Sequence, residues 1–435
     1  MPARAKAPKL ALPVERRTLE NGLRVVLSPD KSSPTVAVAV YYDVGFRSEP
    51  EGRSGFAHLF EHLMFEGSAT LEKMEHARLV QGAGGTFNGS TNSDYTNYFE
   101  ALPSSALELG LFLEADRMRA VRLNQETLEN QIAVVKEEIR VNVMNRPYGG
   151  FPWIHLPPVM FSSWNNAHNG YGSFEDLEAA SVGDAADFFE RYYTPSNAVL
   201  AVVGDFEVDD AMQLVERHFD GIAGRPAPER PRFAEPLPVG EHRAVQHDAM
   251  APTPAVALGY RVPHPILEFD DYLGTVVLAD IFAEGRAARL YRRLVVERRL
   301  ASHVSSYVGT FGNALEMRDP TMLQVLAYYA PDVEVDQILG AVDEVVGEII
   351  TGLEDEEVER VTTALASGVV ARVDNFVQRA LTLAGTEQQR DKPELINELP
   401  AKLFELDAKQ VIRSAEEWVR PARRAVLELV PGAPS

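Results

Sequence analysis

Two histidines and a glutamate lie close together in residues 55–67, which read GFAHLFEHLMFEG. In an α-helix His58 and His62 are one turn apart on one face, with Glu61 beside them. Two imidazoles at this spacing can bind one metal ion, and the neighbouring carboxylate can accept a proton from water. Leu and Phe cover the other helical faces, and a carboxylate in such apolar surroundings needs a metal ion or a proton. The pattern therefore predicts a metal site.

A helix whose histidines only pack or cap is the alternative. The chain has ten histidines, so His-x-x-Glu-His arises by chance in roughly a few per cent of such chains. This order reverses the thermolysin-type His-Glu-x-x-His and is typical of inverted zinc peptidases, whose site needs a third protein ligand and keeps a position for water.

With this motif, the sequence resembles the family of pitrilysin, insulin-degrading enzyme and the mitochondrial processing peptidase. In that family a glutamate in a later helix completes the zinc site, and residues 130–140, NQIAVVKEEIR, match that helix. Glu138 is at the ligand's position. The resemblance therefore implies Zn²⁺ bound by His58, His62 and Glu138, with Glu61 as the general base.

The residues themselves separate Glu138 from Glu137 by a modest margin. Glu138 shares a helical face with three valines, where a carboxylate requires a partner, whereas Glu137 lies beside Arg140 and is expected to be solvated. Active members of the resembled family also carry a glutamate seven residues before the third ligand. Here Gln131 is at that position, which keeps a hydrogen-bond donor and acceptor but loses the charge.

Composition excludes several other classes of protein. The chain has 435 residues, 45% of them hydrophobic, which is enough for two or three domains with their own cores. It has no cysteine, so a metal must be held by histidine and carboxylate. A net charge of −22 argues against a nucleic-acid partner. We find no signal peptide or membrane span in the sequence, and we expect a cytoplasmic protein without a membrane partner.

The elements that must position the site follow from hydrophobic patterning and turn residues. We expect Ser54 to cap the metal helix and interpret His155 and His168 as structural loop residues. The other expected elements are a hairpin over residues 15–27 with an Asn21-Gly22 turn, a strand over 35–44, a helix over 71–81, a polar strand over 86–100, and helices over 107–121 and 125–144.

The polar strand has two interpretations. From its residues alone an ordinary edge strand is favoured, and the functional interpretation is an edge that pairs with an extended peptide. In the resembled family an Asn-Ala pair on this strand holds the substrate backbone beside the zinc. Phe87, Asn88 and Gly89 are therefore the candidate substrate-binding residues; Asn88 matches, and Gly89 replaces the alanine.

The pattern of strands and helices repeats after a proline-rich stretch. We predict an α+β fold of two duplicated domains, each a mostly antiparallel sheet covered by helices. The predicted divisions are a disordered tail over residues 1–14, a zinc-bearing catalytic domain over 15–220, a linker over 221–240, and a similar non-catalytic domain over 241–432. In the second half, the equivalent helix offers Asp280 but no histidine pair.

These observations predict a zinc metalloendopeptidase that cleaves extended, unfolded peptides or leader segments. Half-size members of the resembled family act as pairs, and a facing domain supplies an Arg and, seven residues later, a Tyr. Here those positions hold Val295 and Ser302. The resemblance thus implies a heterodimer with a half-size relative that lacks the zinc motif and carries the Arg/Tyr pair.

Two other functions stay open. The chain can be a non-catalytic structural or peptide-binding subunit of the same fold, or a metal-dependent binding or carrier protein. The first predicts the loss of a ligand or of the base, and none is lost here. The second predicts zinc binding without peptide cleavage.

Overall fold

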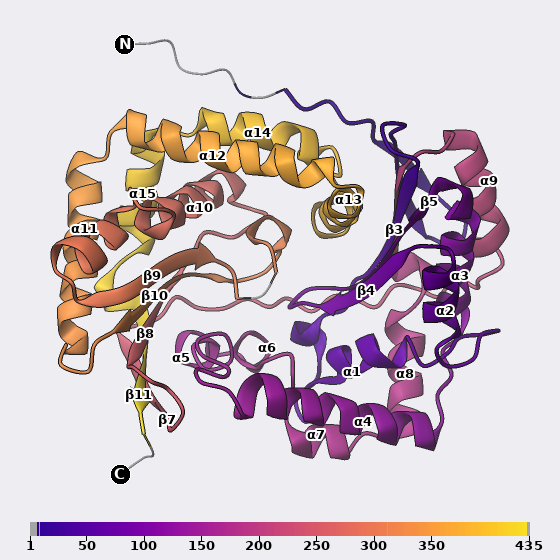
Figure 1. Ribbon diagram of the computed structural model, residues 1–435, viewed down its shortest axis with the longest axis horizontal. Helices are drawn as coiled ribbons and strands as arrows, with labels where there is room; N and C mark the ends of the chain where they lie inside the picture. The colour runs from indigo at the N-terminus through magenta and orange to yellow at the C-terminus, as the bar shows by residue number, and fades with distance from the viewer. Residues whose placement is uncertain (1–6, 8, 311, 433–435) are drawn as a thin grey trace.

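The computed structural model describes residues 7, 9–310 and 312–432, which form two β-sheets surrounded by helices (Figure 1). The first sheet has the order β1-β2-β6-β3-β5-β4 and the second has the order β7-β11-β8-β10-β9. The strands of the first sheet are β1 (Glu15–Thr18), β2 (Arg24–Pro29), β3 (Thr35–Tyr42), β4 (Thr86–Thr91), β5 (Thr96–Pro103) and β6 (Ala198–Gly204). Those of the second are β7 (His242–Asp248), β8 (Ala255–Arg261), β9 (Ala301–Val308), β10 (Met322–Tyr329) and β11 (Arg424–Pro431).

The two sheets repeat one topology. The order β2-β6-β3-β5-β4 of the first corresponds strand by strand to β7-β11-β8-β10-β9 of the second. In each, the first pair is parallel and the others are antiparallel. The predicted α+β fold of two duplicated, mostly antiparallel domains is confirmed, and β1 is an additional edge strand of the first sheet.

Helices cover both sheets. In the first half they are α1 (Phe56–Leu63), α2 (Glu75–Gly82), α3 (Leu107–Arg119), α4 (Gln125–Ile139), α5 (Pro157–Met160), α6 (Trp164–Ala167), α7 (Phe174–Glu178), α8 (Val182–Tyr192) and α9 (Val208–Phe219). In the second half they are α10 (Phe269–Ala283), α11 (Val335–Gly352), α12 (Asp355–Asp374), α13 (Phe376–Arg390), α14 (Leu395–Glu405) and α15 (Ala408–Trp418). A π-helical segment, Arg140–Met144, continues α4, and another spans Tyr291–Glu297.

Each half also covers a face of the other half's sheet. Helix α13 lies against β3 and β6 of the first sheet, as Figure 1 shows beside β3. The side chains of β3 alternate accordingly: Val38 and Val40 pack with the first half's own helices, whereas Ala37 and Ala39 face α13. In return, apolar residues between Phe151 and Phe161 pack on the second sheet. Two apolar clusters therefore combine residues of both halves, besides the main core of each.

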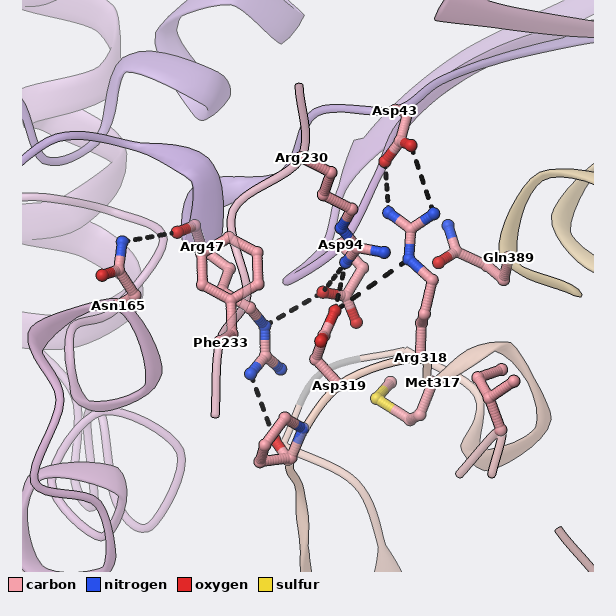
Figure 2. A network of polar contacts seen from close by, with 12 residues as sticks. Asp43, Arg47, Asp94, Asn165, Arg230, Phe233, Met317, Arg318, Asp319 and Gln389 are labelled. Carbon is pink, nitrogen blue, oxygen red and sulfur yellow. Dashed lines mark hydrogen bonds and ion pairs between the residues drawn. The ribbon is translucent and has the colours of Figure 1, made fainter. Parts of the chain in front are cut away.

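A network of arginines and aspartates ties the halves together (Figure 2). Arg47 forms an ion pair of 2.9 Å with Asp94 in the β4–β5 turn, and both side chains are buried. Arg230, in the connecting stretch, pairs with Asp94 and with Asp319 of the second half. Arg318 of the second half pairs with Asp43 of the first. The turn of the β4–β5 hairpin is thus fixed against the second half.

The stretch of residues 221–240 has no helix or strand and is held at several points. Besides Arg230, Phe233 is buried, and Glu235 accepts hydrogen bonds from Ser163 and Asn166. Of the expected N-terminal tail, residues 1–6 and 8 lie outside the described residues. The backbone of Leu12 forms two hydrogen bonds with the Asn397 side chain of α14. Leu10, Leu12 and Val14 also pack against the apolar cluster between α13 and the first sheet.

Most expected elements of the first half are present with their ends close to the predicted bounds, with three differences. The single strand expected over residues 86–100 is wrong, because residues 92–95 turn the chain between the antiparallel strands β4 and β5. Helix α2 begins at Glu75 rather than at residue 71. Ser54 does not cap α1, because its hydroxyl donates to Asp176 instead. Across residues 7, 9–310 and 312–432, no helix combines the length and the apolar character that a membrane crossing requires.

Candidate metal centre

Helix α1 presents the motif on the face that it turns away from the core. Phe56, Ala57, Leu59, Phe60 and Leu63 are buried in the first domain's core, and the other face carries His58, Glu61 and His62. This division follows from the helical period, since apolar residues at positions 56, 59, 60 and 63 form one stripe. The two imidazole rings meet edge to face, with their centroids 4.9 Å apart.

Three potential ligand atoms converge at this face. His58 Nε2 lies 3.3 Å from His62 Nε2, and Glu138 Oε2 lies 3.3 Å from His62 Nε2 and 3.7 Å from His58 Nε2. Tetrahedral ligands at about 2.0–2.1 Å from Zn²⁺ are about 3.3–3.4 Å apart. The donor set and its spacing therefore fit zinc. Within the described residues, no other group of three His, Cys, Asp or Glu side chains converges in this way.

Helix α4 brings Glu138, and not Glu137, to the histidines. Asn124 and Thr127 form a capping box at its start, and buried Val135 and Ile139 anchor its inner face. The Glu137 side chain is exposed and pairs with Arg140 on the outside. Of the valines expected to share the face of Glu138, Val134 and Val141 are exposed, whereas Val135 is buried.

The electrostatics suit a metal ion and a base. Burial, together with neighbouring His62, lowers the pKa of His58 to about 4, so its imidazole is neutral at pH 7 and offers a lone pair. The hydrogen bond with His62 lowers the pKa of Glu138, which stays ionised. Burial raises the pKa of Glu61, although hydrogen bonding to Thr91 opposes the rise. A carboxylate with a raised pKa is the better general base near neutral pH.

The predicted substrate strand is β4, which is an edge of the first sheet and lies against α1 (Figure 1). Asn88 is exposed, whereas the ring of Phe87 packs against Phe65 and His76. A Cβ at Gly89 would lie 3.3 Å from Glu61 Cγ and 3.1 Å from a ring carbon of Tyr98, so glycine lets the strand approach the motif closely. A pocket of about 200 Å³ adjoins the strand and is lined by Phe46, His58, Glu61, Ser90, Thr91 and Tyr171.

The second half offers no equivalent centre in its described residues. Helix α10 takes the place of α1 and carries Asp280 without histidines. Val295 is half-buried, and Ser302 is exposed with its hydroxyl donating to the Tyr328 carbonyl at 3.2 Å. Valine has no hydrogen-bond donor, and the serine side chain is too short to donate where a tyrosine hydroxyl would.

Sequence reasoning missed one residue at the centre, Tyr171. Its hydroxyl lies 3.2 Å from Glu138 Oε1, and its ring contacts His58 edge-on at 5.0 Å between centroids. Burial and the Glu138 carboxylate raise the pKa of Tyr171 to about 12, so it stays a hydrogen-bond donor. The only sequence signal was an aromatic between two glycines in a loop, Gly170-Tyr171-Gly172.

Comparisons with known proteins identify the family of this chain. Residues 24–148 match the family described as Insulinase (Peptidase family M16), and residues 179–365 match the Peptidase M16 inactive domain. An uncharacterized zinc protease of Mycobacterium leprae is 30% identical over 362 residues, which are 78% of this chain and 79% of that protein. The chain belongs to peptidase family M16. The family resemblance predicted from the sequence is thereby confirmed.

Relatives of this M16 chain extend over nearly its whole length. Zinc protease PqqE of Helicobacter pylori is 27% identical over 428 residues, 96% of this chain and 93% of that protein. The crystal structure of a protease from Helicobacter pylori has a TM-score of 0.89 at 26% identity, covering 97% of this chain and 100% of that one. This M16 chain therefore shares its fold with the Helicobacter pylori protease, and its relatives are named zinc proteases.

Proposed function

We propose that the chain is the zinc-bearing subunit of a metalloendopeptidase that cleaves extended peptides or leader segments. The convergence of His58 Nε2, His62 Nε2 and Glu138 Oε2 within 3.3–3.7 Å of one another carries this proposal. A bound Zn²⁺ would act as a Lewis acid towards the scissile carbonyl and the attacking water. The relatives named zinc proteases support the choice of metal.

The chain's own residues would divide the remaining work. Glu61 accepts a proton from the attacking water and returns it to the leaving amine, and its raised pKa suits this exchange. The free edge of β4, at Phe87, Asn88 and Gly89, pairs with the substrate backbone as an added strand. An unfolded peptide can add in this way, whereas a folded domain must first give up its own pairing.

The active site would be completed by a partner. Val295 and Ser302 leave this chain without the Arg and Tyr side chains that would stabilise the developing oxyanion, and losing one such donor typically costs about a hundredfold or more in rate. A half-size relative that carries this pair and lacks the zinc motif would supply it. The missing pair and Gln131 also favour the second candidate function, a non-catalytic or peptide-binding subunit.

The test compares the wild type with Glu61→Gln, alone and mixed with candidate half-size relatives. The wild type should bind about one zinc per chain and cleave an unstructured peptide with its partner, while Glu61→Gln should keep the zinc and lose cleavage by about 10²-fold or more. Full activity of the isolated chain would contradict the heterodimer. Zinc binding without cleavage in any pairing would favour a metal-dependent binding protein, and absence of zinc would contradict the proposed peptidase.

A further inference from the structure

Tyr171 contacts the side of Glu138 that the histidines leave free. Glu138 Oε2 faces His58 and His62, and Tyr171 Oη lies 3.2 Å from the other oxygen, Oε1. The carboxylate is ionised and only accepts, so the phenol is the donor. Nδ1 of His58 is buried without a hydrogen-bond partner. An outer hydrogen bond therefore orients Glu138, whereas none orients the imidazole of His58.

The tyrosine is held rigidly enough to orient its neighbour. Its ring packs against His58 and against Trp153, with centroids 5.0 Å and 5.4 Å away. The hydroxyl contacts Glu138 of α4 while the ring contacts His58 of α1, so one side chain joins the two helices of the centre.

The backbone on either side of Tyr171 is fixed to the start of the metal helix. Gly55, with φ of 86°, immediately precedes α1, and a Cβ there would lie 2.6 Å from the Tyr171 carbonyl oxygen. A Cβ at Gly172, with φ of 74°, would lie 2.3 Å from the Ser54 carbonyl oxygen. At both positions only glycine allows this backbone contact. The backbone of the loop is therefore in direct contact with the start of α1.

We propose that Tyr171 is a positioning residue that keeps Glu138 a monodentate ligand through Oε2. A carboxylate can also turn and bind a metal through both oxygens, which would fill the position needed by water. Here such a turn would break the hydrogen bond from Tyr171 to Oε1. This inference rests on the proposed zinc centre and adds the residue that keeps its fourth position open.

Tyr171→Phe tests the proposal, because it removes the hydroxyl and keeps the ring against His58 and Trp153. Loss of such an outer hydrogen bond typically weakens metal binding about 10–100-fold. We expect this loss for Zn²⁺ titrated into the metal-free full-length chain against a chromophoric chelator. With Co²⁺ as the probe, the visible absorption spectrum should change, because bidentate binding replaces the water ligand with a second carboxylate oxygen. Thermal unfolding of the metal-free variant should match that of the wild type.

Tyr148→Phe is the matched control, since its hydroxyl bonds to the Thr253 carbonyl away from the centre. It should keep wild-type zinc affinity and the wild-type Co²⁺ spectrum. Unchanged zinc affinity in Tyr171→Phe, with a zinc-binding wild type, would overturn the positioning role and leave the zinc centre intact. Equal losses in both variants, or early unfolding of metal-free Tyr171→Phe, would reduce the role to general packing. A wild type that binds no zinc would overturn the proposed function itself.

Discussion

His168 Nε2 lies 3.1 Å from the buried carboxylate of Glu49. The other ring nitrogen faces the Trp164 carbonyl oxygen at 2.9 Å, and the indole of Trp164 stacks on the imidazole. The carboxylate in turn accepts the backbone N–H groups of Gly55 and Ala57, at 2.9 and 2.7 Å. The start of the metal helix, which lacks a capping side chain of its own, is therefore capped from outside.

Replacement of Glu49 by alanine should destabilise the protein more than replacement of Ser54. Glu49→Ala leaves two buried N–H groups without acceptors, at about 1–3 kcal/mol each. Ser54→Ala removes two hydrogen bonds of the hydroxyl, one donated to Asp176 and one accepted from the Ser173 N–H, worth about 1 kcal/mol each. Urea unfolding of the metal-free proteins measures both changes. Equal stability of Glu49→Ala and wild type would show that the cap contributes nothing.

Replacement of Glu138 should remove the metal, and replacement of its neighbour should not. Glu138→Ala deletes one of three protein ligands, whereas Glu137→Ala deletes an exposed carboxylate paired with Arg140. Both lie on the same helix, so their effects on helical propensity are matched. Zinc content after dialysis is the measurement. Full zinc in Glu138→Ala would point to a different ligand set.

The arginine–aspartate network between the halves should contribute strongly to stability. Asp94→Ala leaves Arg47 buried without its partner and removes a contact of Arg230, and breaking a buried pair in this way typically costs about 3–5 kcal/mol. Lys31→Ala is the control, because Lys31 and Glu207 form an exposed pair whose loss should be unmeasurable. Chemical denaturation compares them, and similar midpoints for both variants would contradict the prediction.

Asp280 should make stability fall as pH rises. Burial, followed by the charge of Glu284, raises its pKa from 3.8 to about 6. A carboxyl whose pKa is raised on folding contributes full stability below the unfolded pKa and loses it as pH rises through the folded value. Asp280→Asn should therefore gain about 1–3 kcal/mol over wild type above pH 6 and nothing at pH 3.5. A difference independent of pH would exclude this origin.

The sequence determined the features that have a period or a repeat. The spacing of His58, Glu61 and His62 placed them on one helical face, because four residues make about one turn. β-Branched and aromatic residues predicted strands such as β3, and the recurrence of the pattern of strands and helices predicted two similar domains. The polar composition of residues 86–91 agreed with the position of β4 at a sheet edge.

Tertiary structure decided the features that depend on residues far apart in the chain. The choice of Glu138 over Glu137 required the packing of α4 against α1, and Val134 on its face proved exposed rather than buried. Glu49 and His168 are 119 residues apart, and Tyr171 and Glu138 are 33 apart, so no local pattern links them. Likewise, the hydrophobic period of a helix such as α13 shows that one face is buried but not which element covers it. Only packing shows which sheet it covers, because hydrophobic burial is non-directional.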